Sequence, residues 1–172
     1  MSKHVLVVYA SKYGSTREIA EAIGSTLERN GLRADLKSVG EQVDIGSYDG
    51  VIAGSAVYVG RIRNEMKRFL ADNEKALTQK PVWLFSSGPT DPDENPPEID
   101  GWHQSTALAQ IVERIRPKDT VIFGGALERD QLSRFERWIV ARVKAALRDA
   151  RDWEQIEAWA KGIAVALLGS TT

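Results

Sequence analysis

The 172-residue chain contains no cysteine and only two histidines, His4 and His103. Without thiols it can form no disulfide, no zinc–thiolate or iron–sulfur site and no cysteine nucleophile. Two histidines are too few for a histidine-rich metal site, and no G-x-S-x-G nucleophile motif accompanies them. We therefore expect no metal among the site residues, and any chemistry should come from an organic cofactor.

The chain also lacks a surplus of charge of one sign and any long apolar run. Its net charge is −1, whereas a general nucleic-acid binder needs a basic surplus. The apolar run at residues 5–9 is too short for a signal-peptide core and far too short to span a bilayer. We therefore expect a cytoplasmic protein without a nucleic-acid partner.

Short apolar runs recur along the chain at residues 5–9, 51–53, 82–85 and 121–123. Continuous runs without alternation are typical of strands in a parallel sheet that is buried on both faces. Residues 33–39 differ, because charged side chains alternate there with small or apolar ones. That alternation predicts a strand at an edge of the sheet.

Between the strands, apolar side chains recur every three or four residues, which predicts helices. The helical segments are residues 19–27, 66–70, 108–115, 130–148 and 153–167. Pro117 ends the third of them. One face of the last helix is expected to carry Trp153, Ile156, Trp159, Ala160, Ile163 and Leu167.

Five strands alternating with helices predict a single α/β domain over residues 1–172, with helices on both faces of a doubly wound parallel sheet. Right-handed crossovers leave few topologies for such a sheet. An edge-like second strand beside a buried first strand favours the strand order 2-1-3-4-5. A ligand then binds at the switch point between strands 1 and 3.

The loop after the first strand opens directly into a helix, and its sequence is Ser11-Lys12-Tyr13-Gly14-Ser15-Thr16. It has one glycine where a dinucleotide-binding turn needs three, and it lacks the Gly-Lys-Ser/Thr end of a P-loop. Three hydroxyls around one glycine instead suit a phosphate monoester, held by backbone N–H groups and by side chains. The alternative is a capping box of Ser15 and Glu18, which leaves Ser11 and Gly14 unexplained.

A strand followed by S-x-x-G-S-T and a helix resembles the FMN-phosphate loop of the flavodoxins, although Tyr13 stands where that family usually has threonine. The resemblance implies a flavodoxin-like sheet and FMN as the cofactor. It also implies that the loops after strands 3 and 4 contact the flavin ring. The implied cofactor-binding residues are Ser11, Lys12, Tyr13, Gly14, Ser15, Thr16, Ala56, Val57, Tyr58, Val59, Gly60, Ser86, Ser87 and Gly88.

Tyr58 lies in the loop G-S-A-V-Y-V-G-R, in the place where the flavodoxin resemblance puts an aromatic ring over one face of the flavin. Aromatic faces stack on flat ligands, so we expect Tyr58 to stack there. The alternative is that Tyr58 packs on the neighbouring helix. Trp102 or His103 is a candidate for the other flavin face, with a partly buried anchor as the alternative.

Arg61 and Arg63 follow Tyr58 directly. Positive charge at the flavin rim would stabilise an anionic reduced flavin and attract an anionic substrate, whereas electron-shuttling flavodoxins are strongly acidic around the flavin. We therefore expect Tyr58 and Arg61 to be catalytic residues of a flavin enzyme. The alternative is that both arginines point to solvent at the start of the next helix.

Four segments, Y-A-S-K-Y-G-S-T-R-E-I-A, G-S-A-V-Y-V-G-R, F-G-G-A-L and D-W-E-Q-I-E-A-W-A, resemble the menaquinone-dependent protoporphyrinogen oxidases of the flavodoxin-like superfamily. The resemblance implies an FMN-dependent oxidoreductase with a porphyrinogen substrate and a quinone acceptor. The loop after strand 4 departs from that family, because it is short, proline-rich and acidic. A flavodoxin-type electron carrier and a cofactor-free interaction module are the alternatives.

Residues 129–151 form a basic amphipathic segment with Leu132, Phe135 and Trp138 on its apolar side. Such a helix can lie on an anionic bilayer, which would place the protein peripherally at the inner face of the membrane, near a lipid-soluble quinone. The alternative is a surface helix that packs on its own sheet.

Overall fold

The computed structural model describes residues 2–11, 14–58, 61–88, 101–103, 105–124 and 152–170. Its strands are β1 (His4–Ala10), β2 (Arg33–Ser38), β3 (Gly50–Tyr58), β4 (Arg61–Ile62), β5 (Val82–Gly88) and β6 (Asp119–Gly124). Its helices are α1 (Ser15–Arg29), the 3-10 helix η1 (Ile45–Ser47), α2 (Asn64–Asp72), α3 (Glu74–Leu77), α4 (Thr106–Ile115) and α6 (Trp153–Gly169).

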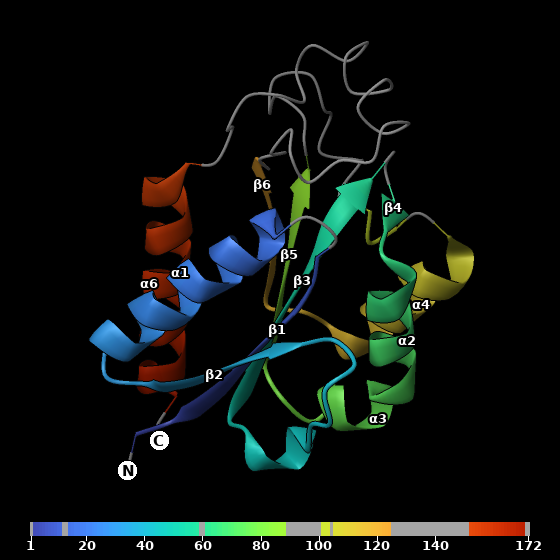
Figure 1. Ribbon diagram of the computed structural model, residues 1–172. Helices are drawn as coiled ribbons and strands as arrows, with labels where there is room; N and C mark the ends of the chain where they lie inside the picture. Colours follow the sequence, from blue (N-terminus) through green and yellow to red (C-terminus); the bar gives the residue numbers. More distant parts are fainter. Residues whose placement is uncertain are drawn as a thin grey trace, which may run out of the picture.

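Five parallel strands form the sheet in the order β2-β1-β3-β5-β6 (Figure 1). Counted among the parallel strands alone, this is the predicted order 2-1-3-4-5. The two-residue strand β4 was not predicted. It pairs antiparallel with the end of β3, with Val57 opposite Ile62 and Tyr58 opposite Arg61.

Helices cover both faces of the sheet, α1 and α6 on one side and α2, α3 and α4 on the other (Figure 1). Side chains of a strand point alternately to the two faces. In β1, Val5 and Val7 therefore pack with α1 and α6, whereas Leu6 and Val8 pack on the opposite side. The buried strands need apolar side chains on both faces, which explains their continuous apolar runs.

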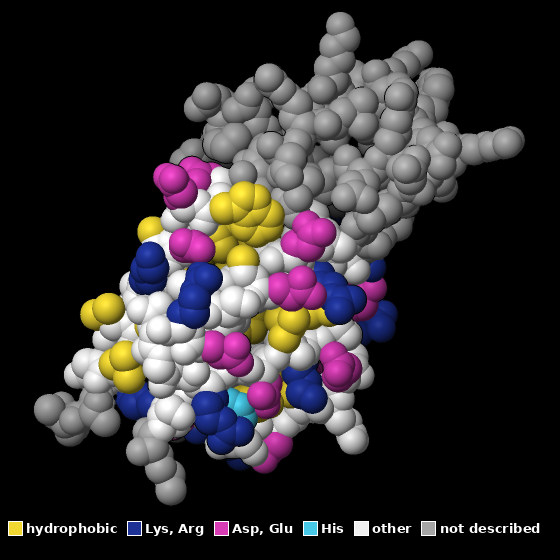
Figure 2. All heavy atoms as spheres, turned by 60° about the vertical axis from the view of Figure 1, so that its left-hand side comes forward, with side chains coloured by type: hydrophobic (Ala, Val, Ile, Leu, Met, Phe, Trp, Pro, Cys, Tyr) yellow, Lys and Arg dark blue, Asp and Glu magenta, His cyan; other side chains and the backbone are white. Residues whose placement is uncertain are grey.

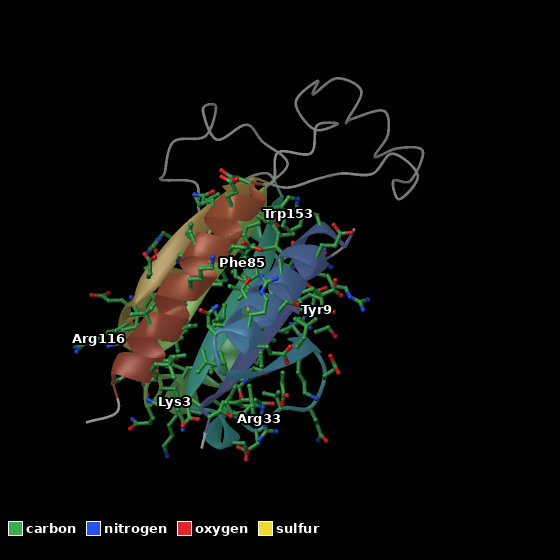
Figure 3. All side chains as sticks on the ribbon, turned by 90° about the vertical axis from the view of Figure 1, so that its left-hand side faces the viewer. Lys3, Tyr9, Arg33, Phe85, Arg116 and Trp153 are labelled. Atoms are coloured by element: carbon green, nitrogen blue, oxygen red, sulfur yellow. The ribbon has the colours of Figure 1, made fainter. Side chains whose placement is uncertain are left out.

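The predicted edge strand is confirmed as β2, where Leu36 remains 36% exposed. The predicted face of α6 needs a correction. Ile156, Ala160, Ile163 and Leu167 are buried, but Trp153 is 41% exposed. Trp153 stands on the first turn, before the buried stripe begins, and Figure 3 shows it at the end of the helix.

The helix before Pro117 ends as predicted. α4 stops at Ile115, and Arg116 adopts a left-handed conformation with φ 54° because the residue before a proline is disfavoured in the helical region. The helix predicted for residues 130–148 lies outside the described residues. In the described ranges, no helix is long and apolar enough to cross a membrane.

Candidate functional site

The turn that begins α1 depends on Gly14. Its φ of 87° is left-handed, a conformation that glycine adopts without a steric penalty. The Gly14 N–H donates to Ser11 Oγ over 3.0 Å, and the Glu18 N–H donates to the Gly14 carbonyl over 3.0 Å. Ser11 thus shapes the turn, and its predicted contact with phosphate stays a prediction.

The capping-box interpretation of this turn is wrong. The N-cap residue is Gly14, and no side chain in the described part of the chain caps the helix. Ser15 is instead the first helical residue, because the positive φ of Gly14 starts the helix one position later than the capping box requires. Backbone N–H groups of the first helical turn have no partner within the helix, so an uncapped N-terminus favours an anion.

Thr16 connects the first predicted loop to the third. Its Oγ1 lies 2.7 Å from Ser87 Oγ, and the two residues are 1% and 3% exposed. Ser87 in turn lies beside Ala56 in the register of β5 and β3. The structure thus brings together three predicted cofactor-binding residues from three separate segments of the chain.

Several predicted residues cannot be placed. Lys12, Tyr13, Val59 and Gly60 lie outside the described residues. For Tyr58 the backbone alone is described, at the end of β3 opposite Arg61. The stacking of Tyr58 on a flavin and the contact of Gly60 with flavin N5 therefore stay predictions.

The two arginines of the β3–β4 hairpin have different surroundings. Arg63 pairs with Glu65 over 2.8 Å, and the Arg63 N–H donates to Ser55 Oγ over 3.0 Å. A hydrogen bond from its own backbone N–H, followed by the Arg63 guanidinium, lowers the pKa of Glu65. Arg61 is exposed and has no ion pair with any residue that the structure describes. Its charge is therefore the one available to a ligand.

Ser86, near the end of β5, is fully buried. Its Oγ has no hydrogen-bond partner among the described residues. A buried hydroxyl without a partner costs about 1–3 kcal/mol. Gly88 ends the strand, two residues further on. An unsatisfied hydroxyl beside the predicted ring-binding loop suits a site that a polar group of a ligand completes.

Trp102 is an interior residue. It is fully buried in the cluster that contains Val57 and Ile62, whereas His103 is exposed. Gly101 before it has a φ of 80°, and a Cβ there would lie 2.7 Å from Ile62 Cγ2. This close approach fixes residues 101–103 against the β3–β4 hairpin. Of the two interpretations of Trp102, the anchor is the one that the structure shows.

Sequence reasoning assigned no role to Ser55 or Gly101, although both shape the site. Ser55 holds the backbone of Arg63, and Gly101 allows the close contact with Ile62. Ser55 could have been noticed, because it alternates with Ala53 and Val57 on a buried face. Nothing local in the sequence distinguishes Gly101 from a loop glycine.

A family model described as "Flavodoxin domain" matches residues 6–153. The chain therefore belongs to the flavodoxin domain family, which confirms the predicted fold. Flavodoxin domain proteins are FMN-binding oxidoreductases and electron carriers, and family membership implies FMN as the cofactor of this chain, as the first loop predicted.

Two relatives and one solved structure illustrate this placement. Protoporphyrinogen IX dehydrogenase [quinone] of Escherichia coli (strain K12) is 23% identical over 172 residues, covering 92% of this chain and 93% of that protein. NAD(P)H dehydrogenase (quinone) of Cupriavidus metallidurans is 32% identical over 92 residues, which is 41% of this chain and 46% of that one. A solved flavodoxin from the domain Archaea shares the fold, with a TM-score of 0.60, 15% identity and coverage of 96% and 99%.

The described residues fit FMN in two respects. The α1 N-terminus, uncapped by any described side chain, suits the phosphate. The unsatisfied Ser86 hydroxyl suits a hydrogen-bonding group near the ring. When bound, FMN supplies reversible transfer of one or two electrons.

Proposed function

We propose that this single-domain chain is an FMN-dependent oxidoreductase that oxidises a porphyrinogen-like substrate and uses a quinone as the electron acceptor. The observation that carries the proposal is the similarity to a protoporphyrinogen IX dehydrogenase that uses quinone, because it covers more than nine tenths of both chains. The second relative, also a quinone-linked dehydrogenase by its name, supports the acceptor.

Arg61 supports an anionic substrate. An arginine can bind a carboxylate through two parallel hydrogen bonds, and porphyrinogens carry carboxylates. Arg61 is exposed, whereas the neighbouring Arg63 is already paired with Glu65. In this proposal Tyr58, opposite Arg61 in the hairpin, stacks on the flavin, and Arg61 orients the substrate.

A flavodoxin-type electron carrier is the second candidate. It is favoured by the match in length to a solved flavodoxin and by the acidic loop 91–100. The distribution of charge speaks against it, since the net charge is −1. On the face shown in Figure 2, acidic and basic side chains are interspersed over the described residues, without a field of one sign.

Residues 129–151 lie outside the described residues. We propose that this basic amphipathic segment contacts the membrane peripherally, where a lipid-soluble quinone would be available. Flotation with anionic vesicles, compared with neutral vesicles, tests that part of the proposal alone.

The main experiment mixes the FMN-loaded protein with protoporphyrinogen IX and a menaquinone analogue under anaerobic conditions. Quinone-dependent formation of fluorescent porphyrin is the expected result. Arg61→Gln should raise the KM for the porphyrinogen about 10-fold or more while leaving the FMN content intact, which corresponds to loss of a charge-assisted contact. Arg63→Gln is the matched control and should leave KM nearly unchanged.

Two outcomes would contradict the enzyme proposal. One is the absence of quinone-dependent turnover in protein that is fully loaded with FMN. The other is a reductive titration with two well-separated one-electron steps, which is the behaviour of an electron carrier. An Arg61→Gln variant with unchanged KM would remove the argument from the positive rim.

A further inference from the structure

We propose that Thr16 and Ser87 act as a positioning pair that fixes the α1 N-terminus against the end of β5, so that backbone N–H groups meet the FMN phosphate. Thr16 would then act through Ser87 and make no direct contact with the phosphate. The inference rests on FMN as the cofactor, and it does not depend on which substrate the protein oxidises.

The first observation is the hydroxyl pair itself. Thr16 lies in the first turn of α1 and Ser87 lies near the end of β5, 71 residues later in the chain. Their Oγ atoms are 2.7 Å apart, which is the usual length of a strong hydrogen bond between hydroxyls. One of the two hydroxyl protons is therefore used between the residues.

The second observation is burial. Thr16 is only 1% exposed and Ser87 only 3%. A phosphate carries a concentrated, strongly hydrated charge, and bringing it to a buried hydroxyl would require its desolvation. The N–H groups of the first turn instead point out along the helix axis, where an anion can remain partly hydrated. A buried Thr16 side chain is thus better suited to hold the helix than to hold the ligand.

The third observation is the nature of the interface that the pair joins. Below Thr16, α1 packs on the sheet through Ile19, Ile23 and Leu27. Apolar packing is non-directional and does not by itself fix the position of a helix along its axis. A hydrogen bond has a defined length and direction, so the pair at the first turn can fix that position.

Ser87 is well placed to transmit this position to the ring end of the site. It lies between Ser86 and Gly88, and beside Ala56 of β3 in the sheet. The side of β5 that faces α1 continues downward with Phe85, which Figure 3 shows between α1 and α6. The pair therefore connects the turn proposed for the phosphate with the strand ends proposed for the flavin ring.

The test compares FMN with riboflavin, which lacks the phosphate, as ligands of the FMN-free protein. Dissociation constants are measured from the quenching of flavin fluorescence for Thr16→Val, for Ser87→Ala and for the double variant. Each single variant should lower the preference for FMN over riboflavin about 10-fold, the effect of one lost hydrogen bond, and the double variant should lower it no further. Thr16→Ser, which keeps the hydroxyl, should retain the preference.

Thr26→Val is the matched control on the same helix. Thr26 is also fully buried, and its hydroxyl donates to the Ala22 carbonyl, away from the site. Its preference for FMN should equal that of the wild type. The proposal is overturned if Ser87→Ala leaves the preference unchanged while Thr16→Val lowers it, because that pattern indicates direct contact with phosphate. Multiplying effects in the double variant, or a wild type that does not distinguish the two flavins, would also overturn it.

These binding measurements need no substrate. A failed double-mutant cycle in a protein that oxidises porphyrinogen rejects the positioning pair alone. A successful cycle in a protein without quinone-dependent turnover rejects the proposed reaction alone.

Discussion

Ser55 and Ser86 lie side by side in β3 and β5, both fully buried, yet only Ser55 has its hydroxyl satisfied. Ser55 Oγ donates to the Ala56 carbonyl and accepts from the Arg63 N–H, each over 3.0 Å. Ser86 Oγ has no hydrogen-bond partner in the described ranges. Two serines in equivalent positions therefore have opposite relations to stability.

The pair gives a direct prediction for the FMN-free protein. Ser55→Ala should lower the free energy of unfolding by about 1–3 kcal/mol, because the Arg63 N–H loses its partner inside the protein. Ser86→Ala should leave that free energy unchanged or raise it, because it removes an unsatisfied hydroxyl. Urea denaturation measures both. Equal destabilisation by the two substitutions would show that Ser86 has a partner in solution.

Gly54 in β3 is required by the ring of Phe85. A Cβ at position 54 would lie 1.9 Å from Phe85 Cζ. The ring cannot move aside freely, because it packs at 6.0 Å from the ring of Phe123 and 6.2 Å from that of Trp159. Gly54→Ala should therefore cost about 3 kcal/mol or more of unfolding free energy.

Gly162→Ala is the matched control for that substitution. A Cβ at this position of α6 has no neighbour within 4 Å, so alanine should stabilise the helix by about 0.5–1 kcal/mol. Thermal unfolding of the two variants should thus shift in opposite directions. A stable Gly54→Ala variant would mean that Phe85 can adopt another position.

Asp35 should make the protein less stable in acid. Its carboxylate lies 3.0 Å from His4 Nε2 and accepts a hydrogen bond from the Tyr48 hydroxyl over 2.8 Å. The bond from His4 is the largest influence that lowers the pKa of Asp35, and the bond from Tyr48 lowers it further. A lowered folded-state pKa means that this stabilisation is present above the pKa of the unfolded chain, about 3.9, and is lost as pH falls through the folded value.

Asp35→Asn should therefore reduce the loss of stability between neutral pH and about pH 3, the range in which an ordinary aspartate begins to protonate. The effect should stay below about 1 kcal/mol, because the side chain is 42% exposed and solvent screens the interaction. Urea unfolding at several pH values measures it. An identical acid dependence in wild type and variant would contradict the assignment.

Trp102 should matter for stability far more than its neighbour. It is fully buried between the β3–β4 hairpin and α4, whereas His103 is exposed. Trp102→Ala should cost about 3–5 kcal/mol, and His103→Ala about 0.5 kcal/mol or less. Denaturant unfolding without FMN gives both values. If Trp102→Ala kept its stability but lost FMN binding, Trp102 would be a flavin contact after all.

The local sequence was sufficient for most of the elements. The apolar runs of β1, β3, β5 and β6 and the alternation in β2 located the strands, because burial on two faces or one dictates side-chain type. The same reasoning misplaced Trp153, since helical periodicity identifies a face but not where the neighbouring sheet ends. It also placed the N-cap at Ser15, because local preference could not show that Gly14 takes a left-handed conformation.

For the site, the sequence by itself determined which segments take part. The hydroxyl-rich loop, the end of the third strand and the end of the next parallel strand were recognisable because their residue types are unusual for loops of a buried sheet. Their meeting at one edge follows from parallel strands and right-handed crossovers.

Only the tertiary structure decided what each hydroxyl and arginine does. Thr16 reaches Ser87, Ser55 holds Arg63 and Ser86 is left without a described partner. Arg63 is neutralised by Glu65, whereas Arg61 is exposed. These differences depend on strand register and on which face of a strand each side chain occupies. A shift of one residue would exchange the two faces, and residue type alone does not specify which side chains then come within hydrogen-bonding distance.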